Sequence, residues 1–161
     1  GWWWMGPYFK RIATRELISM SCALRFSAVC DDARTSPDGK LDLHGVYHDL
    51  SAPGFPAKQD HLVLVLVIEW GRKDHGRFQF KADLEDSEGN ISLTVEGESE
   101  VQAVPEGHPP PRSQLVMPMD SVVFPKPGQY VFQVKVKGET FQGPGIYLRD
   151  LPEEQVAQPE Q

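Results

Sequence analysis

The chain has 161 residues and a mass of 18.1 kDa, which fits a single domain with a sizeable core. A hydrophobic content of 40%, a charged content of 24% and a mean hydropathy of -0.40 exclude a disordered chain and a membrane-embedded one. A net charge of -7 and a pI near 5.2 argue against a nucleic-acid partner, because binding to phosphates requires a basic surface. The 14 glycines and 14 prolines favour many short elements joined by turns.

Residues 1–20 differ from the rest of the chain. Three consecutive tryptophans at positions 2–4 precede basic residues, which reverses the charge order of a secretory signal. We therefore expect an N-terminal extension outside the core, with an interfacial anchor of aromatic and basic side chains as the alternative. The longest apolar run, residues 62–68, is much shorter than the roughly 20 residues of a membrane-spanning helix. We expect a cytoplasmic protein without a membrane partner.

Two cysteines, Cys22 and Cys30, are separated by eight positions. On one extended strand they would share a face at a distance of about 26 Å, whereas a disulfide needs Cα atoms within about 7 Å. We expect two buried free thiols, as is usual in a reducing compartment. Asp31 and Asp32 follow Cys30 directly, and their charges should raise the pKa of its thiol and make it a poor nucleophile.

Alternation with period two begins at Cys22 and predicts a strand. The expected face of this strand consists of Cys22, Leu24, Phe26, Ala28 and Cys30. A turn signal at residues 36–39 precedes a second strand over 41–47. The apolar run 62–68 predicts a central strand covered on both faces. A buried helix fits the same run, but its short length and the following Gly71 favour the strand.

Further strands follow at regular intervals. Residues 77–84 alternate and pair, through a turn at 86–90, with residues 91–95. Residues 96–100 are acidic and should form a solvated edge, and the proline-rich stretch 104–113 should be a surface loop. The clearest amphipathic strand covers 130–136. After a tight turn, the last strand begins at Thr140, is interrupted at 143–145, and resumes at Ile146.

This pattern predicts an all-β domain, an immunoglobulin-like antiparallel β-sandwich of about seven to nine strands. We expect the domain to span residues 21–150 and the polar tail 151–161 to be disordered. The sequence Pro127-Gly128-Gln129-Tyr130 resembles the entry to a tyrosine corner, in which the tyrosine hydroxyl bonds back to the preceding backbone. A fold of this kind does not by itself indicate a function.

A longer stretch resembles a known family. Residues 30–50 read CDDARTSPDGKLDLHGVYHDL, and FPA follows at 55–57. This is similar to a family of small uncharacterised bacterial all-β proteins with a CDDxR…GKLxLxGVY…FPA pattern, and residues 127–139 resemble it too. The similarity covers most of residues 21–150. It implies a compact β-sandwich and carries over no functional residue.

The candidate metal sites are weak at the level of sequence. His44 and His48 are four apart, which in a strand separates them by roughly 13 Å. Asp42 and His44 share one side of the strand, but no third zinc ligand has a diagnostic spacing. An acidic hairpin offers oxygen ligands for calcium, although a solvated turn explains it equally well. The calcium candidates are Asp83, Glu85, Asp86, Glu88 and Asn90.

Other candidates have a structural interpretation beside the functional one. Asp31, Asp32 and Arg34 form a possible binding loop, although an ion pair that fixes the turn is the simpler interpretation. Trp70 could be an aromatic platform for a ligand, but a core position at a strand end fits better. No nucleophile elbow and no phosphate-binding loop is present in the sequence.

These observations favour a non-enzymatic protein-binding or assembly module that acts through an exposed sheet edge. Its expected partner is a protein or a second copy of the chain, and no cofactor is expected. The alternative is a calcium- or small-ligand-binding module that uses the acidic loops. A small hydrolase is a distant third hypothesis.

Overall fold

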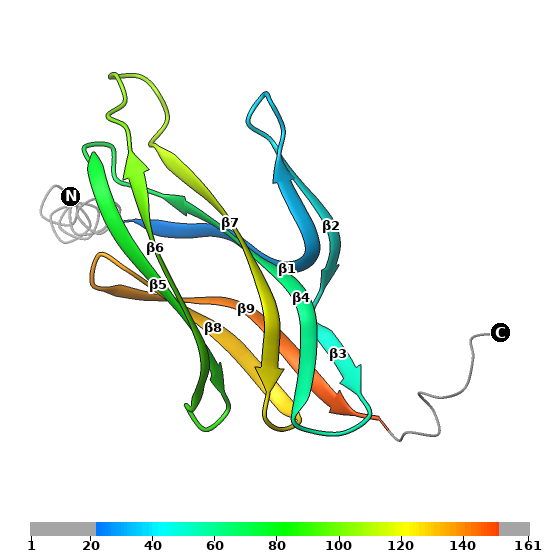
Figure 1. Cartoon of the computed structure of the whole chain (residues 1–161). Helices are drawn as coiled ribbons and strands as arrows, with labels where there is room; N and C mark the ends of the chain where they lie inside the picture. Colours follow the sequence, from blue (N-terminus) through cyan, green and yellow to red (C-terminus); the bar gives the residue numbers. More distant parts are fainter. Residues whose placement is uncertain (1–21, 152–161) are drawn as a thin grey trace, which may run out of the picture.

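A computed structural model describes residues 22–151 as nine strands in two packed sheets (Figure 1). The predictions for the N-terminal extension and for the tail after residue 151 concern residues outside this range. Within it the chain is all-β and contains no helix, as predicted.

Sheet A has four strands and sheet B has five. The order in sheet A is β2 (Leu41–Tyr47), β1 (Ala23–Thr35), β4 (Ala57–Glu69) and β7 (Arg112–Phe124). The order in sheet B is β3 (Asp49–Ala52), β9 (Glu139–Asp150), β8 (Gly128–Val136), β5 (Gly76–Asp86) and β6 (Ile91–Val101). Every pair is antiparallel except β3 and β9, which run parallel.

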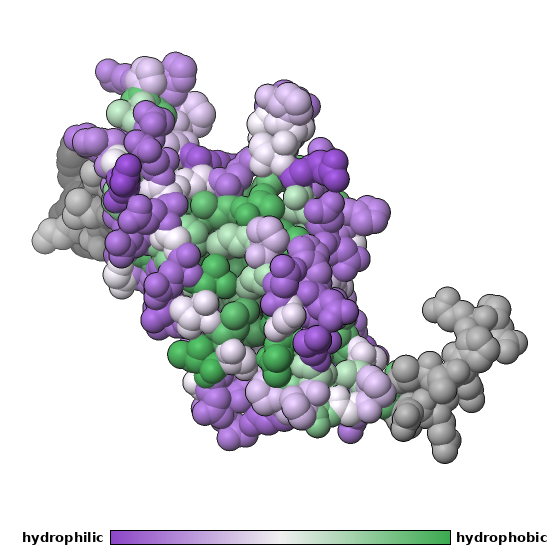
Figure 2. Space-filling view, viewed as in Figure 1, coloured by the Kyte–Doolittle hydropathy of each residue, from purple (hydrophilic) through white to green (hydrophobic). Residues whose placement is uncertain are grey.

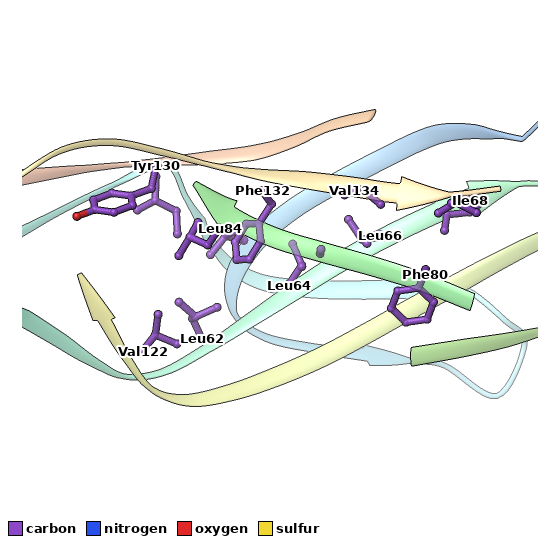
Figure 3. Close-up of a cluster of buried hydrophobic side chains, with 14 of the residues drawn as sticks. Leu62, Leu64, Leu66, Ile68, Phe80, Leu84, Val122, Tyr130, Phe132 and Val134 are labelled. Atoms are coloured by element: carbon purple, nitrogen blue, oxygen red, sulfur yellow. The ribbon is translucent and has the colours of Figure 1, made fainter. Parts of the chain in front are cut away.

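Strand β4 is the centre of sheet A, and its apolar run is buried on both faces, as predicted. Its even-numbered residues point between the sheets, where they meet the alternating apolar residues of β5 and β8 (Figure 3). Burying one such side chain contributes about 1.5–3 kcal/mol, so this layer dominates the stability of the domain. The labelled core residues are Leu62, Leu64, Leu66, Ile68, Phe80, Leu84, Val122, Tyr130, Phe132 and Val134.

The tyrosine corner is present at the start of β8. The Tyr130 hydroxyl donates to the Lys126 carbonyl at 2.7 Å and accepts from the Lys126 N–H at 3.1 Å. Its ring is buried and lies edge-on to Phe124, with 5.0 Å between the ring centroids. The sequence therefore predicted this local geometry correctly.

Strand β1 corrects one prediction. A bulge between Leu24 and Phe26 shifts its register against β4 and reverses which residues face the core. Cys22 and Leu24 consequently pack into the layer between the sheets, whereas Cys30 packs into a separate cluster with Val63 and Val65. The expectation that both cysteines share one face is wrong, because the inserted residue breaks the period of two.

The end of the β1–β2 hairpin packs against β4 and β7 of its own sheet, and Figure 1 shows the sharp bend of β1. Gly45 has a φ of +69° at this bend, and the Asp31 carboxylate occupies the space that a Cβ on Gly45 would take. The Gln114 side-chain amide on β7 donates to the Gly39 carbonyl at the hairpin turn, at 3.1 Å. Apolar residues of the hairpin and of β7 thereby cover the cluster around Cys30. These covering residues are Ala33, Leu41, Leu43 and Val116.

Two other elements differ from the sequence predictions. Strand β3 was not predicted; it pairs with β9 and follows β2 after a single residue, His48. Strand β9 continues through residues 143–145, where an interruption was predicted, and a register shift against β8 accommodates these residues. Gly143 lies against the Phe132 carbonyl, so the glycine permits a close approach of two backbones.

Candidate functional site

A group of partly exposed apolar residues lies where the edges of the two sheets are not joined. Strand β6 is the edge of sheet B and β7 is the edge of sheet A, and their chain connection is the loop 102–111. Figure 1 shows the two strands diverging from this loop, and Figure 2 shows hydrophobic residues gathered in a band on the same face of the molecule. We call this region the open side. Its apolar residues are Leu93 and Val95 on β6 and Leu115, Met117 and Met119 on β7.

The open side is closed at one end by hydrogen bonds. Ser99 on β6 and Ser113 on β7 lie with their hydroxyl oxygens 2.5 Å apart, and the Trp70 indole N–H donates to Ser113 at 2.8 Å. Trp70 is only 2% exposed and stacks on Phe78, so it is a core residue, as its position at a strand end predicted. Away from this end, all five apolar residues of the open side are partly exposed, and Ile91 at the start of β6 is 54% exposed.

The two edges of the open side differ in their capacity to pair with another strand. In the middle of β7, Pro118 has no N–H, and Ser121 has a φ of 54°, which distorts the strand. Strand β6 has neither feature over its 11 residues, and its register shift against β5 lies at its start, between Ile91 and Leu93. Within residues 22–151, an added strand therefore finds on β6 a ladder of N–H and C=O groups that has no partner strand and is regular from Leu93 to Val101, whereas the ladder on β7 is irregular.

Strand β6 is held firmly on its other side. Its Thr94 hydroxyl donates to the Asp83 carboxylate on β5 at 2.7 Å, and Lys135 on β8 reaches the same carboxylate at 3.2 Å. Asp83 is completely shielded from solvent. Burial raises its pKa, but the hydrogen bonds from Thr94 and Lys135 and the charges of Lys81 and Lys135 outweigh this effect, so the pKa of Asp83 is lowered.

The residues of the predicted binding loop, Asp31, Asp32 and Arg34, lie within strand β1 and not in a loop, on the hairpin that β1 forms with β2. Asp32 accepts a hydrogen bond from the Ala33 N–H at 2.9 Å and pairs with Arg34 at 3.3 Å. Cross-strand pairing places His44 opposite Asp32 and Asp42 opposite Arg34, and these four residues line a hollow of about 400 Å³. Asp31 lies apart from them, against Gly45. Asp31, Asp32 and Arg34 therefore mainly fix the hairpin, and all are exposed.

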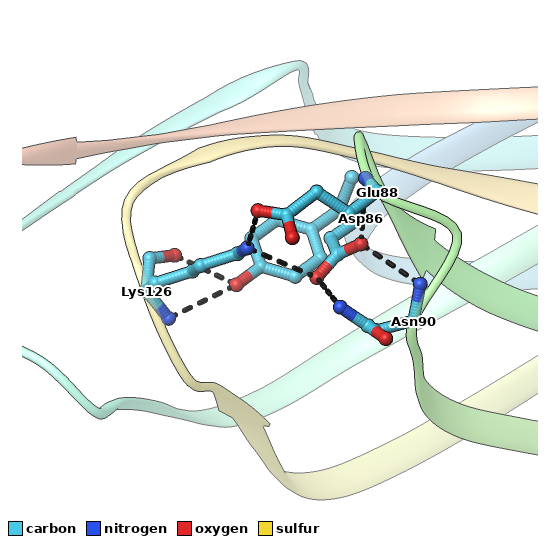
Figure 4. A network of polar contacts seen from close by, with 5 residues as sticks. Asp86, Glu88, Asn90 and Lys126 are labelled. Atoms are coloured by element: carbon cyan, nitrogen blue, oxygen red, sulfur yellow. Dashed lines mark hydrogen bonds and ion pairs between the residues drawn. The ribbon is translucent and has the colours of Figure 1, made fainter.

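The calcium candidates are separated by their hydrogen bonds. Asp83 is bound to Thr94 and Lys135 as described above. One oxygen of Asp86 accepts from the Glu88 and Asn90 backbone N–H groups, both at 2.9 Å. Its other oxygen accepts from the Asn90 side chain at 3.2 Å and lies 3.5 Å from the Lys126 ammonium group (Figure 4). Asp86 thus fixes the predicted turn between β5 and β6, where Gly89 has a positive φ.

Metal binding has no further support within residues 22–151, where no group of three or more histidine, cysteine or acidic residues is placed to hold an ion. Calcium binding by Asp83, Glu85, Asp86, Glu88 and Asn90 stays a prediction. The same holds for the pairing of Asp42 with His44.

Both cysteines are free and buried, as predicted. Burial, and then the charge of Asp31, raises the pKa of the Cys30 thiol. Burial likewise raises the pKa of Cys22. The higher pKa lowers the thiolate fraction at neutral pH, so neither thiol is prepared for nucleophilic attack.

Two further hollows lie on the surface. One, of about 490 Å³, is on sheet B and is lined by residues that include Lys81, Lys135 and Glu96. The other, of about 400 Å³, lies beside Trp70, where Arg25 and Arg112 both pair with Glu69. Burial raises the pKa of Glu69, but the two arginines outweigh this and lower it. Glu69 is thus a paired structural carboxylate and not a proton-transfer group.

Sequence reasoning identified residues 96–100 as a solvated edge but did not find the open side. Its apolar residues alternate as any sandwich strand does, and their partial exposure depends on which strands are the edges of the sheets. No helix among residues 22–151 is long and apolar enough to cross a membrane.

Comparison with known proteins gives a family but no activity. No curated protein matches the chain. Among solved structures, the alkylpurine DNA glycosylase AlkC of Pseudomonas fluorescens, bound to DNA containing an abasic site analog, is 12% identical with a TM-score of 0.39. That alignment covers 76% of this chain and 30% of the glycosylase chain. Residues 25–148 match the model of DUF6941, a family of unknown function, and the chain belongs to this family.

Proposed function

We propose that this domain is a non-enzymatic protein-binding module that accepts an extended segment of another protein along β6. The observation that carries the proposal is the edge of β6, which is regular from Leu93 to Val101 and has no partner strand within residues 22–151, beside the partly exposed apolar residues of the open side. An added strand would form backbone hydrogen bonds with β6 and bury its apolar side chains on the open side.

The composition of the open side supports this function. Met117 and Met119 are the methionines of the described part of the chain, and both lie on the open side. Methionine side chains are flexible and polarisable, and they adapt to partners of different shape. A surface of this kind suits the binding of a segment whose side chains vary in size.

The proposal includes an immunoglobulin-like topology. In such folds the first sheet has the order A-B-E and the second has the order G-F-C-C′, with the tyrosine corner at the start of strand F. Strands β1, β4 and β7 follow the first order, β9, β8, β5 and β6 follow the second, and Tyr130 opens β8. In such folds strand D lies beside strand E, whose place β7 takes here. No strand among residues 22–151 corresponds to strand D, and this accounts for the open side. Two free thiols fit the reducing bacterial cytoplasm that we expect for this protein.

The test uses a fluorescently labelled peptide of alternating valine and serine, which is extended, uncharged and amphipathic as a strand. Binding to the full chain is measured by fluorescence anisotropy up to millimolar peptide. We expect saturable binding that weakens at least about tenfold in Met117→Lys, because a charge on the open side opposes apolar burial.

The control is Tyr147→Lys, which introduces the same charge at a more exposed apolar side chain on β9, where Tyr147 is 47% exposed. This variant should bind the peptide as the wild type does. Absence of binding to the wild type, or an equal loss in both variants, would contradict the proposed site.

A further inference from the structure

Strand β6 has a second face that differs from the apolar one. Its residues alternate, with Leu93 and Val95 towards the core and Glu96, Glu98 and Glu100 on the outer face of sheet B. All three glutamates are exposed. Lys81 and Arg77 on β5 are the cross-strand partners of Glu96 and Glu100, and Gln79 is the partner of Glu98, but none of the three glutamates lies within ion-pair distance of a basic group in residues 22–151.

The side chains of a strand added to β6 would alternate between the two faces of the sheet, as the side chains of β6 do. A strand that pairs with β6 places successive side chains on opposite faces, so every second residue lies beside the core-facing residues and the others lie beside the glutamates. The row of carboxylates runs directly along the edge where the strand would bind. It repels acidic side chains at alternate positions and attracts basic ones.

From this arrangement we infer that the binding partner presents an extended segment in which apolar residues alternate with lysine or arginine. The inference rests on the proposed function, because it specifies the chemistry of the segment that binds β6. The apolar residues of the segment pack on Leu93, Val95 and the facing residues of β7. Its basic residues pair with Glu96, Glu98 and Glu100.

The same row of charges decides against a second copy of this chain as the occupant. Pairing β6 of one copy with β6 of another would bring two rows of glutamates onto the same face of a continuous sheet. Self-association through this edge is therefore disfavoured, and a basic partner is favoured. The full chain should be a monomer at micromolar concentration in low salt.

The experiment compares three labelled peptides of equal length, in which valine alternates with lysine, with serine or with glutamate. We expect the lysine peptide to bind the full chain about tenfold more tightly than the serine peptide in low salt, and the glutamate peptide to bind more weakly than the serine peptide. The advantage of the lysine peptide should largely disappear near 1 M salt, at which exposed charges are screened within about 3 Å.

A variant with Glu96→Lys and Glu98→Lys tests the assignment to β6, and it should bind the glutamate peptide more tightly than the lysine peptide. The control variant, Asp38→Lys with Asp150→Lys, changes the net charge equally at exposed positions away from β6 and should keep the wild-type order. Both pairs alter exposed side chains, and circular dichroism verifies that each variant is folded.

The outcomes separate the two proposals. If all three peptides bind wild-type protein equally, or if the control variant inverts the order as well, the charge preference is wrong while strand binding stands. If no peptide binds, the proposed function itself is wrong. If the protein is a dimer in low salt and the Glu98→Pro substitution dissociates it, then β6 binds a second copy of this chain, and the inference of a basic partner is wrong.

Discussion

The two sides of the domain, along which the edges of the two sheets approach each other, are closed to different extents. On one side the chain passes directly from β2 in sheet A to β3 in sheet B, separated only by His48. Backbone hydrogen bonds tie this crossing to β9, from the Tyr147 N–H to the His48 carbonyl and from the Leu151 N–H to the Ala52 carbonyl, both at 2.8 Å. On the other side, β6 and β7 meet through the serine pair near their connecting loop and then diverge.

This difference decides which apolar side chains are buried and which stay accessible to solvent. On the side where the chain crosses from one sheet to the other, which we call the closed side, the residues of the crossing cover the space between the sheets. The open side has no such link, so the side chains of two edge strands stay partly in water. An exposed apolar band next to an unpaired strand edge is typical of an interaction site.

The largest expected effect compares two residues that face each other in sheet A. Leu64 and Met117 are cross-strand partners on β4 and β7, but Leu64 is fully buried and Met117 is partly exposed. Leu64→Ala should reduce the free energy of unfolding by about 2–5 kcal/mol, since it leaves a cavity. Met117→Ala should cost about 1 kcal/mol, because less apolar area is lost. Equal costs in urea denaturation would mean that the open side is as well buried as the core.

A smaller effect tests the folded hairpin next to the closed side. Gly45→Ala should destabilise the protein by about 2 kcal/mol or more, because alanine at positive φ is strained and its Cβ would overlap the Asp31 carboxylate. Gly39→Ala is the control, since Gly39 also has a positive φ but has open space around its Cα. It should cost about 1 kcal/mol in thermal melts. If both variants lose the same free energy of unfolding, the close contact between position 45 and Asp31 does not contribute to the cost of the substitution.

The smallest effect concerns the anchoring of β6 to sheet B. Because the pKa of Asp83 is lower in the folded protein than in the unfolded chain, its contribution to stability is present above the unfolded pKa of about 3.9. This contribution is lost as the pH falls through the folded pKa. Thr94→Val removes one hydrogen bond to the carboxylate and should cost about 1 kcal/mol at pH 7.

The pH dependence of that variant provides the check. Removing the Thr94 hydrogen bond makes the folded-state pKa of Asp83 less depressed, so the acid loss of stability still begins near the unfolded pKa but ends at a higher pH. Urea denaturation between pH 7 and pH 2 should therefore show a smaller acid loss of stability in Thr94→Val than in the wild type, and the two stabilities should converge at low pH. An identical acid profile, with stability unchanged at pH 7, would show that Thr94 does not help to hold β6 in place.

The sequence was sufficient where local pattern determines structure. Alternation over residues 130–136 and the glycine at position 89 predicted a strand and a turn that the fold contains. The bulge at the start of β1 was not predictable, because Arg25 fits the alternation of polar and apolar residues and the shift appears only in pairing with β4. The parallel strand β3 is short, and its pairing depends on β9, which lies about ninety residues further on.

For the candidate site, the sequence revealed the charges of β6 and not their setting. Glu96, Glu98 and Glu100 were recognised as a solvated edge. Their position beside the exposed apolar residues of β7 follows from sheet order, which no local pattern encodes. The acidic turn at residues 86–90 illustrates the opposite case: its residue types fit a cation, while its hydrogen bonds serve the turn.

Amide hydrogen exchange of the full chain, with and without a saturating amount of the alternating lysine–valine peptide, tests the central claim most directly. The account predicts that the peptide slows exchange in β6, at residues 91–101, and leaves the edge strands β2 and β3 of the closed side unchanged. Protection confined to β2 or β3, or no protection of β6 when the peptide is bound, would contradict it.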